Sequence, residues 1–415
     1  MSDPRDLLRM ADDLHADDHT DGSGVDEARE AERVAEEALA AERTARAARS
    51  VEADRANLVT TRGRRQWPLP KQADPSAPLL VVEDLRTHFK LGSGWVKAVD
   101  GVSFRLNDGE ALGLAGESGC GKTTTALSLV RLLPSNARIR KGSSIKLYGI
   151  DLVPKTEEQL RRYRWREVSI VFQGAMSALN PVRRVGEQIA EPIEIRLGET
   201  KDRSRRRASE LLELVGIPRK RAESYPHELS GGMRQRAMIA MALACDPAIV
   251  IGDEPTTALD VMVQAQILQL LERLRQELGL SLILITHDLS VIAETCDRTL
   301  VMYAGKVAEE GPVRRIFTAP RHPYTQKLLG AFPSIHADRR GLDTIPGQPP
   351  DLRDPPSGCR FHPRCPFVMP VCKEVVPPEV LFPDGVRVAC HLHPPGQDGG
   401  ELVTAADVAA RSVPA

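Results

Sequence analysis

Short apolar runs, each ending in polar or turn residues, recur along the chain from Leu79 to about Gly305. Six of them are typical of buried strands: LLVVEDL (79–85), ALGLAGE (111–117), VSIVFQ (168–173), AIVIGDE (248–254), SLILITH (281–287) and RTLVMYAG (298–305). Helical stretches follow several of these runs, notably TTTALSLVRLL at 123–133 and VMVQAQILQLLERLRQEL at 261–278. Strands that alternate with helices predict an α/β fold with a largely parallel sheet covered by helices.

Three other stretches depart from this pattern. Residues 1–76 are acidic, then rich in Ala, Glu and Arg without a wide apolar stripe, and end in a Pro-rich linker, so we expect a solvated helix or disorder, with a docking role as the alternative. The helical, charged region at about 175–230 predicts an inserted helical subdomain within a domain spanning 77–320. The Pro- and Cys-rich residues 321–395 predict a separate C-terminal module, and residues 396–415 a flexible tail.

Composition narrows the class of protein. The 415 residues carry 56 basic and 57 acidic side chains, and a net charge of -1 gives no overall field that would attract nucleic acid. The N-terminus lacks the pattern of a secretory signal, and no apolar run reaches the roughly 18 residues of a membrane span. We therefore expect a cytoplasmic protein, whose seven cysteines are not paired in disulfides, unless a partner carries it to a membrane.

The stretch GESGCGKTTT predicts a phosphate-binding loop. Gly116, Gly121, Lys122 and Thr123 fit the pattern G-x-x-x-x-G-K-[ST] of a Walker A loop, between a predicted strand and a predicted helix. Such a loop curls its N–H groups around phosphate oxygens at a helix N-terminus, while the lysine reaches the β- and γ-phosphates and the threonine hydroxyl suits Mg²⁺. The predicted nucleotide contacts are Gly116, Glu117, Ser118, Gly119, Cys120, Gly121, Lys122, Thr123 and Thr124.

An acidic pair supplies the second half of the predicted site. Asp253 and Glu254 end the apolar run AIVIGDE, so they project from the carboxyl edge of a parallel sheet, where ligands bind in such folds. We expect Asp253 to face the metal and Glu254 to orient or deprotonate the attacking water.

Between these two motifs lies LSGGMRQR, Leu229–Arg236, which resembles the signature motif of the ATP-binding cassette (ABC) ATPases. Further motifs match that family in order: Gln173 in VFQ as the Q-loop, Asp260 in TALD as the D-loop, and His287 in LITHD as the switch histidine. The resemblance covers about residues 79–320. It implies a parallel core sheet with an antiparallel β subdomain and an inserted helical subdomain.

The resemblance also implies a role for each motif. Two cassettes would pair head to tail, so that ATP on one Walker A loop is closed by Ser230, Gly231 and Gly232 of the partner, with Asp260 also at the nucleotide. Catalytic roles would fall to Glu254, His287 and Gln173. The Mg²⁺ ion would be held by Thr123, Gln173 and Asp253.

An aromatic residue before the second strand stacks on adenine in the family. Phe89 in RTHFKLGSG aligns best, and Trp95 is the alternative. Phe89 could equally be a core residue.

Other segments resemble the oligopeptide/dipeptide/nickel importer group of that family: SALNP, YPHELSGG, RHPYTQKLLGAFP, IPGQPPDL and GCRFHPRCPF. This resemblance implies an ATPase at the cytoplasmic face of the cell membrane that energises import of di- or oligopeptides. Its partners would be a second cassette, with a paralogue favoured over a copy, two transmembrane permease subunits and, indirectly, an extracytoplasmic solute-binding protein. Nickel or another small solute stays open as cargo, and a soluble ABC ATPase acting on ribosomes or DNA is the alternative from another class.

Four late cysteines form the last candidate site. Cys359, Cys365, Cys372 and Cys390 are separated by five, six and seventeen residues. Four thiolates can enclose either tetrahedral zinc or an iron–sulfur cluster, but the paired C-x₂-C spacing usual for structural zinc is absent. The resemblance to the peptide importers favours a 4Fe-4S cluster, with zinc and then free thiols as alternatives.

Overall fold

The computed structural model describes residues 73–74, 76–174, 178–257, 259–331 and 345–410. They belong to one compact unit that spans Trp67–Ala415. The predictions made for the N-terminal extension up to residue 72 lie outside the described residues.

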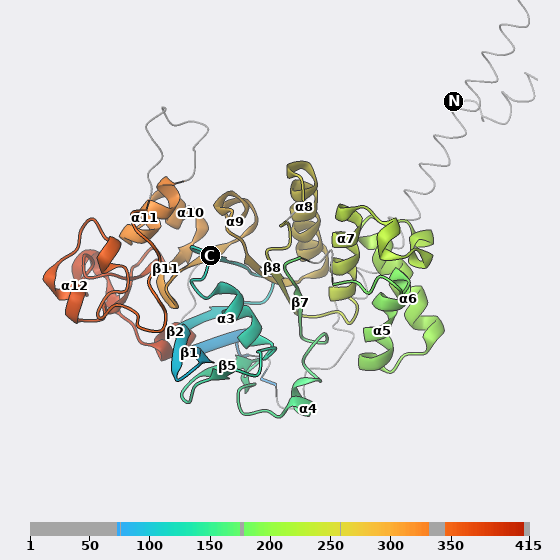
Figure 1. The fold of residues 1–415 in the computed structure, drawn as a ribbon, viewed down its shortest axis with the longest axis horizontal. Helices are drawn as coiled ribbons and strands as arrows, with labels where there is room; N and C mark the ends of the chain where they lie inside the picture. The colour runs from blue at the N-terminus through green and yellow to red at the C-terminus, as the bar shows by residue number, and fades with distance from the viewer. Residues whose placement is uncertain (1–72, 75, 175–177, 258, 332–344, 411–415) are drawn as a thin grey trace, which may run out of the picture. The chain divides into compact units, whose positions relative to one another are not determined.

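A parallel sheet forms the centre of this unit (Figure 1). Its strands run in the order β10-β3-β9-β8-β7, and each neighbouring pair is parallel. The bounds are β3 Ala111–Ala115, β7 Val168–Val171, β8 Ile249–Asp253, β9 Ser281–Ile285 and β10 Arg298–Tyr303. Every residue of β3, β8, β9 and β10 is buried, as expected for continuous apolar runs covered on both faces. The predicted parallel sheet is confirmed.

Helices connect these strands. The bounds are α3 Lys122–Leu129, α8 Val261–Leu278 and α9 Leu289–Thr295. Helix α8 coincides with the predicted stretch because both ends are marked: the Asp260 carboxylate accepts from the Val263 N–H at 3.0 Å, and Gly279 closes the helix in the left-handed region with φ 60°.

A second, antiparallel sheet is also present, as the resemblance implied. Two of its strands come before α3 in the chain and three come after it. Its strand order is β2-β1-β5-β6, with β4 also paired to β1. The bounds are β1 Leu80–Leu91, β2 Gly94–Leu106, β4 Ala137–Ile139, β5 Ser144–Leu147 and β6 Ile150–Asp151. A short helix, α4 Glu157–Leu160, leads from this sheet to β7.

The predicted helical insertion is present in the described residues after the 175–177 gap, and it continues beyond residue 230. It contains α5 Val185–Leu197, α6 Lys201–Leu214, η2 Arg219–Glu223, η3 Pro226–Glu228 and α7 Gly231–Ala242. Ile189, Leu211 and Ala237 are buried in one hydrophobic cluster with residues of α8, so the insertion packs on the core through its apolar sides.

The C-terminal region extends the central sheet instead of forming a sheet of its own. Strand β11 pairs with β10 on one side and with β13 on the other, and β12 and β14 follow, all antiparallel. An unpaired β11 edge would expose a row of main-chain donors and acceptors, which β13 satisfies. Residues 397–410, which the sequence places in the tail, form η5, β14 and α13, and Val403 and Ala409 there are buried.

The bounds in this region are β11 Lys306–Pro312, α10 Val313–Thr318, α11 Pro323–Gly330, η4 His362–Arg364, α12 Pro370–Glu374, β12 Glu379–Leu381, β13 Arg387–Ala389, η5 Gln397–Gly399, β14 Glu401–Leu402 and α13 Ala405–Ala410.

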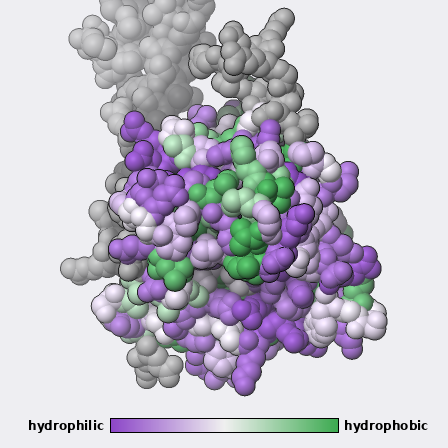
Figure 2. Space-filling model, turned by 90° about the vertical axis from the view of Figure 1, so that its left-hand side faces the viewer, coloured by the Kyte–Doolittle hydropathy of each residue, from purple (hydrophilic) through white to green (hydrophobic). Residues whose placement is uncertain are grey.

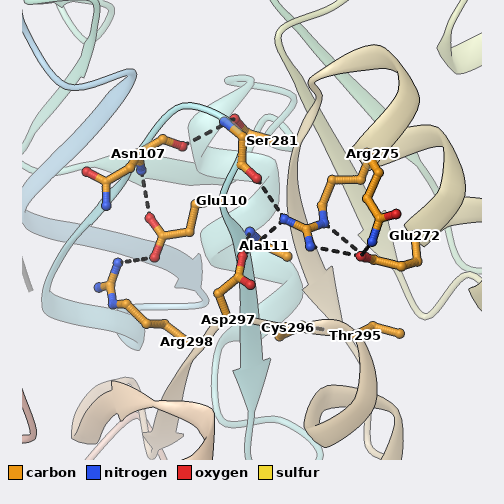
Figure 3. Close-up of polar contacts among 12 residues, drawn as sticks. Asn107, Glu110, Ala111, Glu272, Arg275, Ser281, Thr295, Cys296, Asp297 and Arg298 are labelled. Atoms are coloured by element: carbon orange, nitrogen blue, oxygen red, sulfur yellow. Dashed lines mark hydrogen bonds and ion pairs between the residues drawn. The ribbon is translucent and has the colours of Figure 1, made fainter. Parts of the chain in front are cut away.

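Paired charges line the amino ends of the parallel strands (Figure 3). Arg298, 1% exposed, donates to Glu110 at 2.5 Å and also pairs with Glu310. Beside it, Arg275 donates to the Gly109 carbonyl at 2.8 Å and lies 3.2 Å from the Asp297 carboxylate. These contacts connect the starts of β3 and β10 and the end of α8.

The face over α12 gathers large exposed apolar side chains (Figure 2). They are Phe367, Val368, Val371, Val375 and Val376. Apolar side chains collected in this way are typical of contact surfaces. Within the described part of the chain, no helix combines the length and the apolar character that a membrane span requires.

Candidate active site

The Walker A loop leaves the end of β3 at Gly116 and enters α3 at Lys122. Gly116 has φ 140°, and a Cβ atom there would lie 2.2 Å from the Met302 carbonyl oxygen. Gly121 has φ 110°, and its Cβ would lie 2.3 Å from the Ala98 carbonyl oxygen. Both positions therefore require glycine, because a side chain would meet main-chain atoms in a conformation that L-residues rarely adopt.

Lys122 is held against the loop that precedes it. Its ammonium donates to the carbonyls of Gly116 at 2.7 Å and Glu117 at 3.1 Å, and the side chain is buried. Cys120 is buried beside it, and its carbonyl accepts from the Gly305 N–H at 2.9 Å. The loop thus keeps a positive charge next to a helix N-terminus, an arrangement suited to phosphate.

Thr123 and Asp253 meet across the site. The Thr123 hydroxyl donates to Asp253 Oδ1 at 3.0 Å. Burial raises the pKa of the Asp253 carboxyl, and the neighbouring Glu254 adds to this, while the Thr123 hydrogen bond opposes it. A hydroxyl and a buried carboxylate are oxygen donors that suit Mg²⁺, which would also favour the ionised carboxylate.

Glu254 stands in a strained and well-defined position. Its φ of 47° lies in the left-handed region, and its N–H donates to the Ile285 carbonyl at 2.8 Å. Oε2 accepts from Gln173 Nε2 at 2.7 Å and from the Thr257 hydroxyl at 2.9 Å, while Oε1 lies 3.6 Å from His287 Nδ1. Thr257 was missed by the sequence reasoning, although it lies only three residues after Glu254 in DEPTT.

The strand order explains why these residues meet. The Walker A loop follows β3, His287 follows β9, Glu254 follows β8 and Gln173 follows β7, and these four strands are neighbours in that order. Because they are parallel, their carboxyl ends lie on one edge of the sheet. The tertiary structure therefore brings together the predicted residues of this half-site.

Two family models match this chain: residues 99–257 match the ABC transporter model, and residues 308–372 match that of the oligopeptide/dipeptide transporter C-terminal region. A Sinorhizobium fredii protein, provisionally named a peptide ABC transporter ATP-binding protein, is 46% identical over 323 residues, which are 77% of this chain and 96% of the relative. The chain belongs to the ABC transporter family. A Brucella abortus relative, provisionally named a peptide import ATP-binding protein, is 49% identical over 316 residues, covering 76% of this chain and 94% of its own length.

Solved structures agree with this family. The dimeric structure of an ATP-binding cassette bound to ADP and Pi is 27% identical, with a TM-score of 0.51, and is matched over 57% of this chain and 99% of its own. A cassette of Clostridium perfringens that is part of an ABC transporter complex has the same TM-score at 26% identity, over 59% of this chain and 92% of its own. The chain is an ABC-type ATPase.

Helix α7, at whose start the signature residues of this ABC cassette lie, is separate from α3, at whose start the Walker A loop ends (Figure 1). Ser230 precedes α7, is exposed, and its hydroxyl accepts from the Met233 N–H at 3.3 Å. Gly232 packs against Val263, where a Cβ atom would lie 2.7 Å from Val263 Cγ1. Together with Gly231, and with Asp260 at the start of α8, these residues form no hydrogen bond with the Walker A loop in the described part of the chain.

The geometry does not choose between the two adenine-stacking candidates of the cassette. Phe89 is half-buried on β1 and pairs with Val96 of β2. Trp95 is also half-buried, and the Arg140 guanidinium lies 5.1 Å from its ring centroid. The role of Phe89 at adenine stays a prediction.

The four late cysteines lie close enough to influence one another's ionisation. Burial raises the pKa of Cys359 to about 11 and that of Cys390 to about 12, and the neighbouring thiols add to both shifts. The main-chain N–H groups of Phe361, Phe367 and Leu392, each two residues further along the chain, lower the pKa values of Cys359, Cys365 and Cys390 and so oppose the effect of burial. In the described residues, however, no three His, Cys, Asp or Glu side chains form a group that could hold a metal ion. The predicted iron–sulfur site is therefore not confirmed.

Proposed function

We propose that this chain is the ATP-hydrolysing subunit that energises import of di- or oligopeptides across a cell membrane. The observation that carries the proposal is the convergence of Lys122, Asp253, Glu254 and His287 on one sheet edge. The match of residues 308–372 to a C-terminal region of oligopeptide/dipeptide transporters supports peptides as the cargo. The names of the relatives from Sinorhizobium fredii and Brucella abortus support it as well.

Each residue of the half-site then has a chemical task. Lys122 and the loop N–H groups bind the phosphates, while Thr123, Asp253 and Gln173 hold Mg²⁺. Glu254 orients or deprotonates the attacking water, and His287 contacts the γ-phosphate.

The hydrogen bonds of Glu254 suit this task. Gln173 and Thr257 both donate to Oε2, which fixes the orientation of the carboxylate. Among the described residues, Oε1 has only the longer contact to His287, and it is the oxygen that we assign to the water.

A second cassette would complete the site with its Ser230, Gly231 and Gly232, and its Asp260 would lie at the interface. The exposure of Ser230 and the separation of α7 from α3 (Figure 1) support this pairing, as does the dimeric form of the solved relative. The N–H groups at the start of α7 would then bind the γ-phosphate from across the interface. We favour a paralogous cassette as the partner, with two permease subunits, an extracytoplasmic binding protein, and a position at the cytoplasmic face of the membrane.

Affinity purification of the tagged full chain from detergent-solubilised membranes tests this proposal. Mass spectrometry should recover two multi-span subunits and a second cassette. Membrane vesicles with these subunits should take up labelled peptide in the presence of ATP, and vesicles carrying Glu254→Gln should not. Recovery of ribosomal or DNA-processing proteins alone would contradict a role in transport. Uptake of nickel without uptake of peptide would show that nickel, and not peptide, is the cargo.

We further propose that Cys359, Cys365, Cys372 and Cys390 hold a 4Fe-4S cluster. The main-chain N–H groups that lower the pKa values of three of these thiols would stabilise thiolates, and mutual repulsion of thiolates would be relieved by a cation. Such a cluster would stabilise the loops between η4 and β13.

Chemical analysis distinguishes the alternatives for this site. The full chain purified without oxygen should contain about four iron and four sulfide ions per chain. Cys365→Ser should lose them, whereas Cys245→Ser, at a buried thiol of another region, should keep them. Zinc in place of iron would support the tetrahedral alternative, and an absence of both metals would contradict the proposal.

A further inference from the structure

The C-terminal region holds one residue of the Walker A loop, Glu117, by two separate contacts. The Tyr324 hydroxyl, on α11, accepts from the Glu117 N–H at 2.8 Å. The Arg364 guanidinium, at the end of η4, donates to both Glu117 carboxylate oxygens, at 2.7 and 3.0 Å. Tyr324 is fully buried and Arg364 is 8% exposed.

We propose that Tyr324 and Arg364 are positioning residues that set the affinity of the cassette for ATP by holding Glu117. The inference rests on the proposed role of the Walker A loop in binding the nucleotide phosphates. It gives the C-terminal region a task at the ATP site, in addition to its place in the central sheet.

Glu117 transmits these contacts to the phosphate-binding lysine. Its N–H is held by Tyr324, its carboxylate by Arg364, and its carbonyl accepts from Lys122 Nζ at 3.1 Å. A displacement of Glu117 therefore displaces an acceptor that orients the lysine ammonium.

Such anchors matter because three residues of the loop are glycines, which have more conformational freedom than other residues. Gly116, Gly119 and Gly121 all have positive φ, with values of 140°, 78° and 110°. Glycine-rich segments lose much conformational entropy when they are ordered. Contacts that order the loop before ATP arrives reduce that loss at binding, and so raise the affinity.

Charge makes Arg364 more than a mechanical support. Glu117 places a carboxylate in a loop that is assigned to bind phosphates, and the two-pronged ion pair with Arg364 neutralises it. Without the guanidinium, the carboxylate would repel the nucleotide. Loss of Arg364 alone should therefore weaken ATP binding more than loss of Arg364 and the Glu117 charge together.

The two anchors are themselves held by one aromatic cluster. The Tyr324 ring packs on Tyr303, with centroids 4.6 Å apart, and on Phe361 at 5.4 Å. Arg364 donates to the Tyr303 hydroxyl at 3.3 Å and to the Pro346 carbonyl at 2.7 Å. Both anchors are thus fixed before any ligand binds, as a positioning role requires.

Nucleotide titration of the full chain and its variants tests the proposal, with the dissociation constant for ATP, the steady-state KM and kcat, and the melting temperature measured for each. Tyr324→Phe removes only the hydroxyl and should raise the dissociation constant about fivefold. Arg364→Ala should raise it about tenfold or more, and Arg364→Lys, which keeps the charge, should recover part of the loss. Adding Glu117→Gln to Arg364→Ala should restore affinity to within about threefold of wild type. KM should follow the dissociation constant while kcat changes little.

Arg321→Gln is the matched control. It breaks another ion pair of the same region, Arg321 to Asp384 at 3.0 Å, whose arginine is more exposed than Arg364, without touching the loop. It should leave ATP affinity unchanged even if the melting temperature falls.

Two results would overturn the proposal. One is wild-type affinity for ATP in both Tyr324→Phe and Arg364→Ala, whatever their melting temperatures. The other is a loss of ATP affinity in Arg321→Gln as large as that in Arg364→Ala. Wild-type affinity in Lys122→Ala would instead contradict the ATP site itself, and with it this inference.

Discussion

The two edges of the parallel sheet use charge in opposite ways. At the amino edge, Arg298 is buried and pairs with Glu110 (Figure 3) and also with Glu310, so each charge has a close partner. At the carboxyl edge, Glu254 keeps a positive φ of 47°, and His287 is 71% exposed and 3.6 Å from it. The sheet thus carries close ion pairs at one edge and strained or loosely paired groups at the other.

This difference indicates which edge serves stability and which serves chemistry. A fully paired buried charge contributes to stability only while its partners remain, since removal of one leaves the other uncompensated. Strained, incompletely paired groups persist where function requires them and the surrounding structure holds them. Substitutions at the two edges should therefore separate activity from stability.

The largest expected effect is loss of turnover at the carboxyl edge. Glu254→Gln should lower kcat about 10³-fold or more, because the amide cannot accept the proton of the attacking water. Its hydrogen bonds with Gln173 and Thr257 can persist, so the free energy of unfolding should change by less than about 1 kcal/mol. Steady-state ATP hydrolysis and urea unfolding measure both quantities. Undiminished hydrolysis would exclude Glu254 as the catalytic carboxylate.

The amino edge should show the reverse. Arg298→Met leaves the buried Glu110 without its guanidinium and should lower the free energy of unfolding by about 3–5 kcal/mol, while kcat per folded molecule stays the same. Arg353→Met provides the comparison, because its pair with Asp351 is exposed to solvent and its loss should lower the free energy of unfolding far less. Equal losses in the two variants would contradict the view that burial decides the effect.

An intermediate effect is a pH dependence of stability caused by His322, the residue that precedes α11. Burial lowers the pKa of His322 from 6.5 to about 3, and the neighbouring His393 adds to the shift. Below pH 6.5 the unfolded chain therefore binds a proton that the folded chain does not, so stability is complete above about pH 6.5 and falls towards pH 3. This residue alone should remove about 2 kcal/mol between pH 6.5 and 5.

Denaturant unfolding at several pH values measures this dependence. His322→Asn keeps an acceptor for the Tyr324 N–H but does not titrate, so its stability should change less between pH 6.5 and 5. An unaltered pH dependence in this variant would show that other groups cause the loss.

The smallest expected effect is again at the amino edge. The Ser281 hydroxyl accepts from the Gly109 N–H at 2.8 Å and donates to the Asn107 carbonyl at 3.2 Å (Figure 3). Ser281→Ala should cost about 1 kcal/mol of stability and leave ATP hydrolysis unchanged. A larger fall in kcat than in stability would mean that the two edges are coupled through the sheet.

Much of the cassette was predictable because its signals are local. The runs at 248–254 and 281–287 became β8 and β9, and Asp260 and Gly279 mark the ends of α8. The Walker A residues were identified because Gly116, Gly121, Lys122 and Thr123 have the fixed spacing that such a loop requires. Glu254, His287 and Gln173 were recognised individually by motif, and only the strand order brings them within reach of one another.

The C-terminal region was less predictable because its contacts are distant in the sequence. Strand β13 has only three residues, Arg387–Ala389, too few for a clear periodicity, and its place beside β11 follows from hydrogen bonds that a sheet edge leaves open. The cysteines could be identified as a group, but their arrangement around a metal could not be deduced from spacing.

The sequence by itself determined the order of strands and helices, the glycine-rich loop and the identity of the acidic pair, since these depend on periodicity and on residue types a few positions apart. Only the tertiary structure decided that Arg364, 247 residues from Glu117, holds the Walker A loop, and that Thr257 and Gln173 share one oxygen of Glu254. Such contacts depend on the order of the strands in the sheet and on the packing of the C-terminal region against the Walker A loop. Residues close together in the sequence carry no pattern that predicts either feature.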